Sequence, residues 1–379
     1  MREQVFSTRI TELLGIRHPI LCGGLLWLAD ARYVAAAVNA GAMGFITCMS
    51  FPGDPEGFRR EIRRCRELTE GKPFGVSVSI GRRPDIVEVL TPMIDVIVEE
   101  GVRFVETSGN NPGWLLPRLK DAGCIVIHKV PAVRYALSAE RLGVDAVTVI
   151  SGEAGGHTGQ FMVGQIVQGP LAADALTVPL VLGGGMGDGR HLVSTLAMGA
   201  DAMMLGSRMV VAEEIWAHTQ YKQHVTQLDE VASRVVMGSF GKQHRVLDNE
   251  AARKVAELEA EGVTDFEAYR DLIAGTHVRA AYESGDWKEG MIDMGPAGVF
   301  ASRIEPVEAI IDGIIDRAVA ALNAVNAAAG RDAGGHTAGD ADSGRTPSSA
   351  ADANPAGEPS SSSAASSQTP EAAQGDLRS

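Results

Sequence analysis

Eight short apolar runs alternate with amphipathic segments between residues 19 and 205, and this alternation restricts the possible folds more than any other feature of the sequence. The runs are apolar on both faces, which is typical of parallel strands that are covered by helices. We therefore expect strands at residues 19–22, 44–48, 74–79, 103–107, 124–128, 145–149, 179–182 and 201–205.

The segments between these runs have the spacing of amphipathic helices. Many of them are followed by a glycine, the residue that most often ends a helix in the left-handed conformation. The expected helices cover residues 31–39, 55–68, 85–99, 114–120, 133–142 and 189–198, and the glycines are Gly41, Gly71, Gly101, Gly123, Gly143 and Gly199.

Eight strand and helix units in about 190 residues predict an α/β protein built as a closed (β/α)8 barrel, the TIM barrel. The alternative is an open doubly wound sheet, whose first strand-to-helix turn is expected to carry a Gly-x-Gly-x-x-Gly pattern. The first turn here reads Gly23-Gly24-Leu25-Leu26-Trp27 and lacks that pattern. The barrel is therefore the favoured prediction.

The alternation stops after residue 211, which predicts a second part of the chain. We expect a small helical appendage over residues 212–299, with helices at 213–225, 229–236, 249–261 and 265–274 and no strand between them. This appendage is expected to be a lid over the barrel mouth, a dimer contact or an addition without a functional role. The TIM barrel then comprises residues 1–211 and 300–326, with its last helix at 305–322. Residues 327–379 are rich in Ala, Gly, Ser, Asp and Pro, so we expect a disordered tail.

The composition excludes several classes of partner. The net charge of −14 argues against a nucleic acid, because phosphate binding needs clustered Lys and Arg. No apolar run reaches the roughly 18 residues that a membrane helix needs, and the first residues lack a signal peptide pattern. The four cysteines lack metal-ligand spacing. We expect a reduced, cytoplasmic protein without a metal site or a membrane partner.

Polar and glycine-rich stretches follow almost every expected strand. Because the active site of a TIM barrel lies at the carboxyl ends of its strands, these stretches are expected to share one rim. They comprise Gly23 and Gly24, Ser77 and Ser79, residues 106–110, His128 and Lys129, and residues 151–159, 183–189 and 206–208.

The loop at residues 151–159 holds four glycines and one histidine, His157. Glycines such as Gly155 and Gly156 let the backbone approach a bulky ligand closely, since no Cβ intervenes. His157 is the side chain in this loop that can exchange a proton near neutral pH, so it is the candidate catalytic residue. The alternative is a flexible loop with a solvated histidine.

The loops after the seventh and eighth strands commonly bind phosphate in this fold. The backbone at Gly184, Gly185 and Gly206 and the hydroxyl of Ser207 are candidate phosphate ligands. Lys129 would place a cation at the base of the pocket, where a positive charge favours electron density on a reduced ring system. The alternatives are a glycine-rich turn without a ligand and a surface lysine. His128 points away from Lys129 by strand alternation and is interpreted as a packing residue.

Four motifs together resemble the nitronate monooxygenase family, formerly called 2-nitropropane dioxygenases, over about residues 5–325. They are Glu153-Ala154-Gly155-Gly156-His157-x-Gly159, Gly183-Gly184-Gly185-x-x-Asp188-Gly189-Arg190, Gly199-Ala200-Asp201 and Leu205-Gly206-Ser207-Arg208. The resemblance implies an FMN-dependent TIM barrel. It assigns His157 as the catalytic residue, and it assigns FMN contacts to Gly23, Gly24, Ser77 or Ser79, Lys129, Gly184, Gly185, Gly206 and Ser207.

The resemblance leaves several activities open. The first prediction is a nitronate monooxygenase that oxidises alkyl nitronates with O2 to carbonyl compounds and nitrite. The alternative is an NAD(P)H:quinone reductase, or an enoyl reductase, on the same FMN barrel. Residues 105–113 and 139–147 resemble the quinone reductase branch, whereas residues 150–157 are nearer to the monooxygenase form. A third reading is a flavin-binding barrel without catalytic activity.

Overall fold

Eight parallel strands form a closed barrel in the computed structural model, which describes residues 3–330. The strands are β1 (Ile20–Cys22), β2 (Met43–Thr47), β3 (Gly75–Ile80), β4 (Phe104–Gly109), β5 (Ile125–Val130), β6 (Ala146–Ile150), β8 (Leu180–Gly183) and β9 (Ala202–Leu205). The barrel closes where β1 pairs with β9, with Leu21 opposite Met204. All eight expected strands are present, and the predicted TIM barrel is confirmed.

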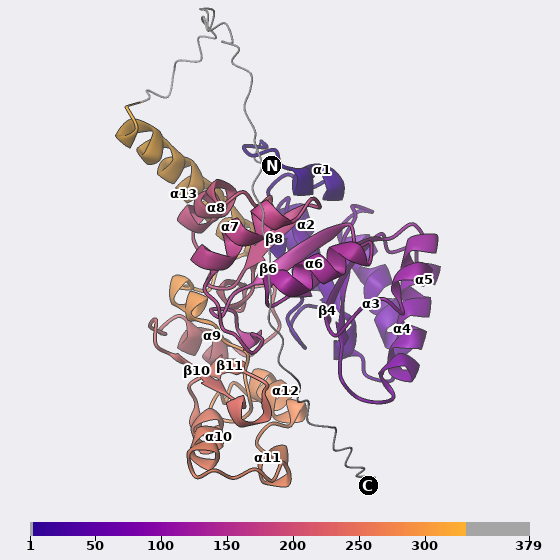
Figure 1. The fold of residues 1–379 in the computed structure, drawn as a ribbon, viewed down its shortest axis with the longest axis vertical. Coiled ribbons are helices and arrows are strands. Elements are labelled where there is room, and N and C mark those ends of the chain that lie inside the picture. The colour runs from indigo at the N-terminus through magenta and orange to yellow at the C-terminus, as the bar shows by residue number, and fades with distance from the viewer. Residues whose placement is uncertain (1–2, 331–379) are drawn as a thin grey trace, which may run out of the picture. The chain divides into compact units, whose positions relative to one another are not determined.

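One helix follows each barrel strand and covers the outside of the barrel (Figure 1). The helices are α2 (Ala31–Asn39), α3 (Pro55–Leu68), α4 (Ile86–Glu99), α5 (Leu116–Asp121), α6 (Val133–Arg141), α7 (Gln165–Ala175), α8 (Gly189–Ala197) and α13 (Val307–Ala328). Each glycine that was expected to end a helix has a positive φ, between 62° at Gly101 and 91° at Gly41. Helix α7 was not predicted, and α13 extends two residues into the segment that was assigned to the tail.

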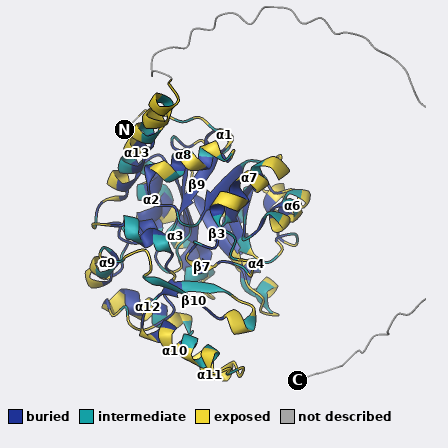
Figure 2. Ribbon diagram, turned by 60° about the vertical axis from the view of Figure 1, so that its left-hand side comes forward, coloured by how far each residue is buried: buried dark blue, intermediate teal, exposed yellow. Residues whose placement is uncertain are grey.

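The apolar residues fall into two layers around the strands. Figure 2 shows the strands buried inside a shell of helices whose outer faces are exposed. The short helix α1 (Arg9–Leu14) lies at the amino end of the barrel. Its buried Ile10 and Leu14 pack with the strand residues Leu21, Phe45 and Phe104. This plug leaves the carboxyl end of the barrel for polar groups.

The appendage contains strands as well as helices, so the prediction of an all-helical segment is wrong. It comprises α9 (Thr219–Val225), β10 (Ser233–Val236), β11 (His244–Leu247), α10 (Glu250–Ala260), α11 (Glu267–Arg270) and α12 (Gly275–Ser284). Strands β10 and β11 pair antiparallel around Gly238 and Gly241, and β-branched Val235 and Val236 pair with the opposite strand instead of continuing a helix.

The appendage is tied to the barrel through a shared sheet. The strand-six loop supplies β7 (Gly156–His157), which pairs with β11. Residues 3–330 accordingly form one compact unit. The rest of the expected tail, from residue 331 onward, lies outside the described residues. No helix within residues 3–330 has both the length and the apolar character that a membrane crossing requires.

Candidate active site

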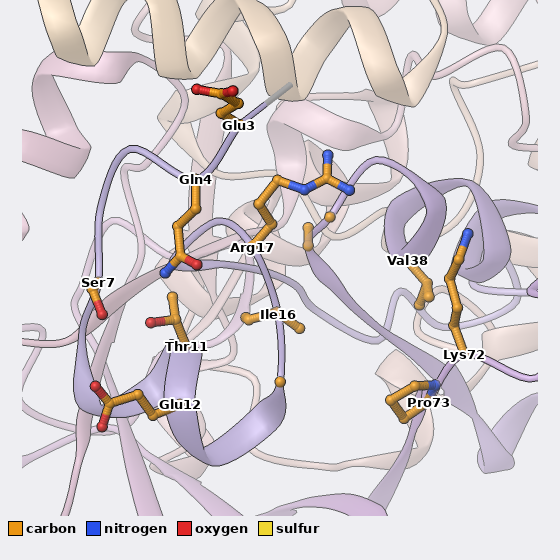
Figure 3. A pocket seen from close by; sticks show the side chains of 13 residues that line it. Glu3, Gln4, Ser7, Thr11, Glu12, Ile16, Arg17, Val38, Lys72 and Pro73 are labelled. Carbon is orange, nitrogen blue, oxygen red and sulfur yellow. The ribbon is translucent and has the colours of Figure 1, made fainter. Parts of the chain in front are cut away.

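The structure places two cavities at different parts of the barrel. A cavity of about 660 Å³ opens near the amino end, beside α1 and the residues before β2 and β3 (Figure 3). A second cavity of about 370 Å³ lies beside the loops that follow β6 and β8. Although it is smaller, the second cavity adjoins the sequence-predicted residues Gly184 and Gly185, whereas Lys129 and His157 line neither cavity. The carboxyl end is therefore the candidate active site, as expected for this fold.

An ion pair lies inside the barrel beneath the carboxyl mouth. Lys129 on β5 donates to Glu106 Oε2 on β4 at 2.9 Å, and the Ser77 hydroxyl on β3 donates to the same oxygen at 2.9 Å. The Glu106 side chain is fully buried, and that of Lys129 is 19% exposed. The charge of Lys129 is therefore balanced by Glu106, a carboxylate to which the sequence analysis assigned no role, and a contact of Lys129 with a cofactor stays a prediction.

Two buried oxygens beside this pair lack a protein partner. They are Glu106 Oε1 and Thr148 Oγ1, neither of which has a hydrogen bond within residues 3–330. Thr148 on β6 is opposite Lys129 in the strand register. Because buried polar atoms are usually hydrogen-bonded, the floor of the mouth has unused capacity for a polar ligand.

The loop after β1 passes closely over Ser77. A Cβ added at Gly24 would lie 2.6 Å from Ser77 Cβ and 2.9 Å from Thr47 Oγ1, so only glycine fits there. Ser77 is buried under this loop, whereas Ser79 lies nearer the solvent and shares a hydrogen bond of 3.1 Å with Ser108. Gly23 sits beside Met204. The predicted contacts on β1 and β3 are therefore neighbours at the mouth.

His157 lies in the short strand β7 and stacks on a histidine of the appendage. The rings of His157 and His244 are 4.3 Å apart at their centroids and inclined by 14°. His157 is exposed to solvent, whereas Gly156 beside it is buried. Partial loss of hydration, and to a lesser extent the nearby His244, lower the pKa of His157 below its usual value, against a smaller opposing effect of Asp293. The imidazole is therefore neutral at neutral pH.

His244 and Asp293 are site residues that sequence reasoning missed. His244 Nε2 lies 2.6 Å from Asp293 Oδ1. The Asp293 side chain is half exposed, and although partial loss of hydration acts to raise its pKa, the hydrogen bond and the charge of His244 hold that pKa below its usual value. The two valine-containing runs flanking Gly238 and Gly241 were a signal for the hairpin that carries His244, whereas no pattern marked Asp293.

The glycines of the strand-six loop make room for the segment that follows Asp293. A Cβ at Gly155 would lie 2.8 Å from the nitrogen of Gly295, and a Cβ at Gly295 would lie 2.5 Å from the oxygen of Glu153. Gly156 faces the Asp293 carboxylate, 3.2 Å from its added Cβ. These glycines thus serve a close backbone approach within the protein, and a direct cofactor contact at Gly155 and Gly156 stays a prediction.

The loops after β8 and β9 differ in the space that they leave. Gly184 and Gly185 have φ values of 97° and 71°, and a Cβ at Gly184 would lie 2.4 Å from Ser151 Oγ. A Cβ at Gly206 would meet no atom within 4 Å. The hydroxyl of the buried Ser207 accepts a hydrogen bond from the nitrogen of Gly295 at 2.8 Å. Gly206 therefore borders open space that a phosphate group can fill.

Two charged residues in the motifs have partners within the protein. Arg208 is buried and donates to Glu305 Oε1 at 2.6 Å. Asp188 caps α8 and accepts hydrogen bonds from Arg190 and Arg317. The pair with Glu305 occupies Nη2 of Arg208, whereas its Nη1 has no hydrogen-bond partner within residues 3–330. Within residues 3–330, no group of three or more His, Cys, Asp or Glu side chains is arranged to hold a metal ion.

The closed parallel barrel and its polar, glycine-lined carboxyl mouth define a TIM-barrel protein with an enzyme-type site. The family model described as nitronate monooxygenase matches residues 7–317. The chain belongs to the nitronate monooxygenase family, which confirms the resemblance seen in the sequence. Members of this family are flavoproteins, and the chain is an oxidoreductase.

Two curated relatives illustrate the range of activities among similar proteins. The (3aS,4S,5R,7aS)-5-hydroxy-7a-methyl-1-oxo-octahydro-1H-indene-4-carboxyl-CoA dehydrogenase of Mycobacterium tuberculosis is 32% identical over 249 residues, which are 65% of this chain and 68% of that protein. A probable nitronate monooxygenase of Staphylococcus saprophyticus is 28% identical over 73% of this chain and 88% of its own length.

Solved structures show the same fold. FabK from Thermotoga maritima superposes with a TM-score of 0.78 at 31% identity, over 86% of this chain and all of that chain. A nitroalkane oxidase from Streptomyces ansochromogenes gives a TM-score of 0.70 at 23% identity, over 83% of this chain and 99% of its own. At this lower identity, the second likeness concerns the fold alone.

Proposed function

We propose that this chain is an FMN-dependent nitronate monooxygenase. The observation that carries the proposal is the position of His157 in the loop after β6, where its ring stacks on His244 and its neutral imidazole can accept a proton at neutral pH. In the overall reaction, two alkyl nitronate anions and one O2 give two carbonyl compounds and two nitrite ions.

The residues at the mouth fit an FMN group. The open space at Gly206 and the neighbouring Ser207 suit its phosphate, together with the positive-φ backbone of Gly184 and Gly185. The unpartnered Glu106 Oε1 and Thr148 Oγ1, with Lys129 between their strands, suit the polar edge of its ring system. Bound FMN would supply the electron-accepting chemistry that no amino-acid side chain can provide.

The protein's own residues would orient the substrate and handle its proton. A neutral His157 removes the α-proton of a nitroalkane, or donates a hydrogen bond to the nitro oxygens of a nitronate that is already ionised. Lys129 stays paired with Glu106, so the barrel floor does not present an uncompensated cation to the anion.

A reductase acting with NAD(P)H on a quinone or an acyl thioester is the second candidate. Two cations, Arg82 and Lys242, lie near enough to His157 to contribute to its lowered pKa. Cations at the entrance suit the phosphates of a nucleotide or a coenzyme A group. This reading also agrees with the carboxyl-CoA dehydrogenase relative at 32% identity.

Anaerobic mixing of the flavin-loaded protein separates the two candidates. One sample receives an alkyl nitronate and the other receives NADH or NADPH, while the visible absorbance of the flavin is followed. Reduction by the nitronate with inert nicotinamides supports the monooxygenase. Rapid reduction by a nicotinamide, with an inert nitronate, overturns it in favour of the reductase.

Substitution of His157 tests the residue that carries the proposal. His157→Asn is expected to lower turnover of a neutral nitroalkane about a hundredfold or more, while the bound flavin content is unchanged. The matched control is His277→Asn, because His277 lies on α12 and is not among the mouth residues. Equal nitroalkane turnover by the His157 variant and the wild-type protein would contradict the assigned role.

A further inference from the structure

The stacked partner of His157 comes from a part of the chain that is distant in sequence. Strand β11 pairs antiparallel with β7, and the register places His244 opposite His157 and Arg245 opposite Gly156. Directly opposed side chains lie on the same face of a sheet, which is why the two rings can stack. The appendage therefore reaches into the site that the barrel loops form.

His244 is itself fixed by a neighbouring segment. The backbone nitrogen of Leu247 donates to the oxygen of Ile292 at 2.8 Å, so the segment preceding Asp293 runs beside β11. The Asp293 carboxylate thereby comes within 2.6 Å of His244 Nε2. The His244 side chain is only 14% exposed, which restricts the positions its ring can take.

Four ionisable groups influence the pKa of His157 through their charges. Arg82 lies between β3 and α4, and Asp293 lies in the segment beside β11. Lys242 precedes β11, and His244 is its first residue. The three basic groups disfavour a proton on His157, and Asp293 favours one. His244 makes the largest contribution of these charges.

We propose that His244, with Asp293 as its counter-charge, is the positioning residue of His157. The ring of His244 holds the His157 ring by stacking, and the hydrogen bond to Asp293 fixes the position of the His244 ring. Part of the active site is then supplied by the appendage. The proposal rests on the proposed function only in assigning His157 a role in turnover.

Three variants separate the ring of His244 from its charge. His244→Ala removes both, whereas His244→Phe keeps an aromatic ring and removes the charge. Asp293→Asn is then added to the His244→Phe variant, where His244 can no longer respond to it. Each is prepared as the full flavin-loaded chain, with His277→Ala as the matched control on α12.

The first measurement is the titration midpoint of His157 by NMR, which needs no substrate. Loss of the positive neighbour is expected to raise the midpoint by about one pH unit in both His244 variants. Addition of Asp293→Asn to His244→Phe is expected to lower it again, because the remaining negative charge is removed. Unmoved midpoints, or a further rise with Asp293→Asn, would overturn the electrostatic part of the proposal.

The second measurement is kcat above the midpoint, with whichever substrate reduces the flavin. Loss of the stacked ring in His244→Ala is expected to lower kcat about tenfold to a hundredfold with little change in KM, since His157 is no longer held in place. His244→Phe is expected to stay within about threefold of the wild-type kcat. Equal kcat values for the Ala and Phe variants would overturn the positioning role.

The two measurements also separate this proposal from the proposed function. If nitronates fail to reduce the flavin but the midpoints move as expected, the monooxygenase assignment is wrong and the coupling between His244 and His157 stands. Folding of each variant is checked by circular dichroism. His244→Phe tests the charge even if His244→Ala does not fold.

Discussion

Lys129 and Glu106 form an ion pair inside the barrel, with Lys129 Nζ 2.9 Å from Glu106 Oε2 and the carboxylate fully buried. The Ser77 hydroxyl donates a hydrogen bond to the same oxygen of Glu106. Removing one member of such a pair leaves a buried charge without compensation, and that loss usually costs more than the pair itself contributes. The pair therefore links the stability of the barrel to the chemistry at its mouth.

Lys129→Met is expected to lower the free energy of unfolding by about 3 kcal/mol, because Glu106 is left buried and unpaired. Urea denaturation measures this effect. The double variant Lys129→Met and Glu106→Gln removes both charges and is expected to recover most of the loss. A single variant as stable as the wild-type protein, or a double variant no better than the single one, would contradict the argument.

A second prediction concerns the contact between the strand-six loop and the appendage. Gly295→Ala places a Cβ 2.5 Å from the oxygen of Glu153, so the backbone must separate there. We expect a loss of about 1 to 3 kcal/mol in the free energy of unfolding, measured with urea, and reduced turnover because His157 lies in the same loop. Gly313→Ala in α13 is the matched control, since its Cβ meets no atom within 4 Å. Equal stability of the two variants would show that the contact is not tight.

The strands of the barrel could be predicted because each has a strong local signal. For example, residues 145–149 are apolar on both faces and precede a glycine-rich loop, a pattern set by burial within a parallel sheet. The same reasoning predicted Lys129 and Ser77 near the mouth, because each lies toward the carboxyl end of an expected strand. Helix α7 was missed because its face is not clearly amphipathic, with Ile166 and Leu171 exposed.

The appendage could not be predicted as well, because its structure depends on distant pairing. Residues 233–236 and 244–247 are short strands whose partners include a two-residue strand almost 90 residues earlier, at His157. Local sequence carries little information about such pairings. For the same reason, the contact between His244 and Asp293 follows only from the folded arrangement.

A third prediction tests the phosphate position. Gly206→Ala adds a methyl group where no protein atom lies within 4 Å, so the stability of the flavin-free protein is expected to change by less than about 1 kcal/mol. If the space receives the phosphate of FMN, the same methyl group is expected to weaken FMN binding about tenfold or more. Fluorescence titration of the flavin-free protein with FMN measures the affinity. An unchanged affinity would place the phosphate elsewhere.

The last prediction concerns His128, which the structure confirms as a buried packing residue. Its Nδ1 shares a hydrogen bond of 2.8 Å with the Thr107 hydroxyl. Burial, with a smaller effect from the charge of Lys129, lowers the pKa of His128 to about 4. In the unfolded chain the pKa returns to about 6.5, so between these values the unfolded state binds the extra proton.

Stability is therefore expected to fall as the pH decreases from about 6.5 to about 4, by roughly 3 kcal/mol from this one residue. His128→Asn retains a polar group for Thr107 but cannot take up the proton. The variant should lose stability less steeply over this interval than the wild-type protein, whatever its stability at neutral pH. Urea denaturation at several pH values measures the two slopes. Because the other histidines are common to both proteins, parallel slopes would mean that His128 is protonated equally easily in the folded and unfolded states.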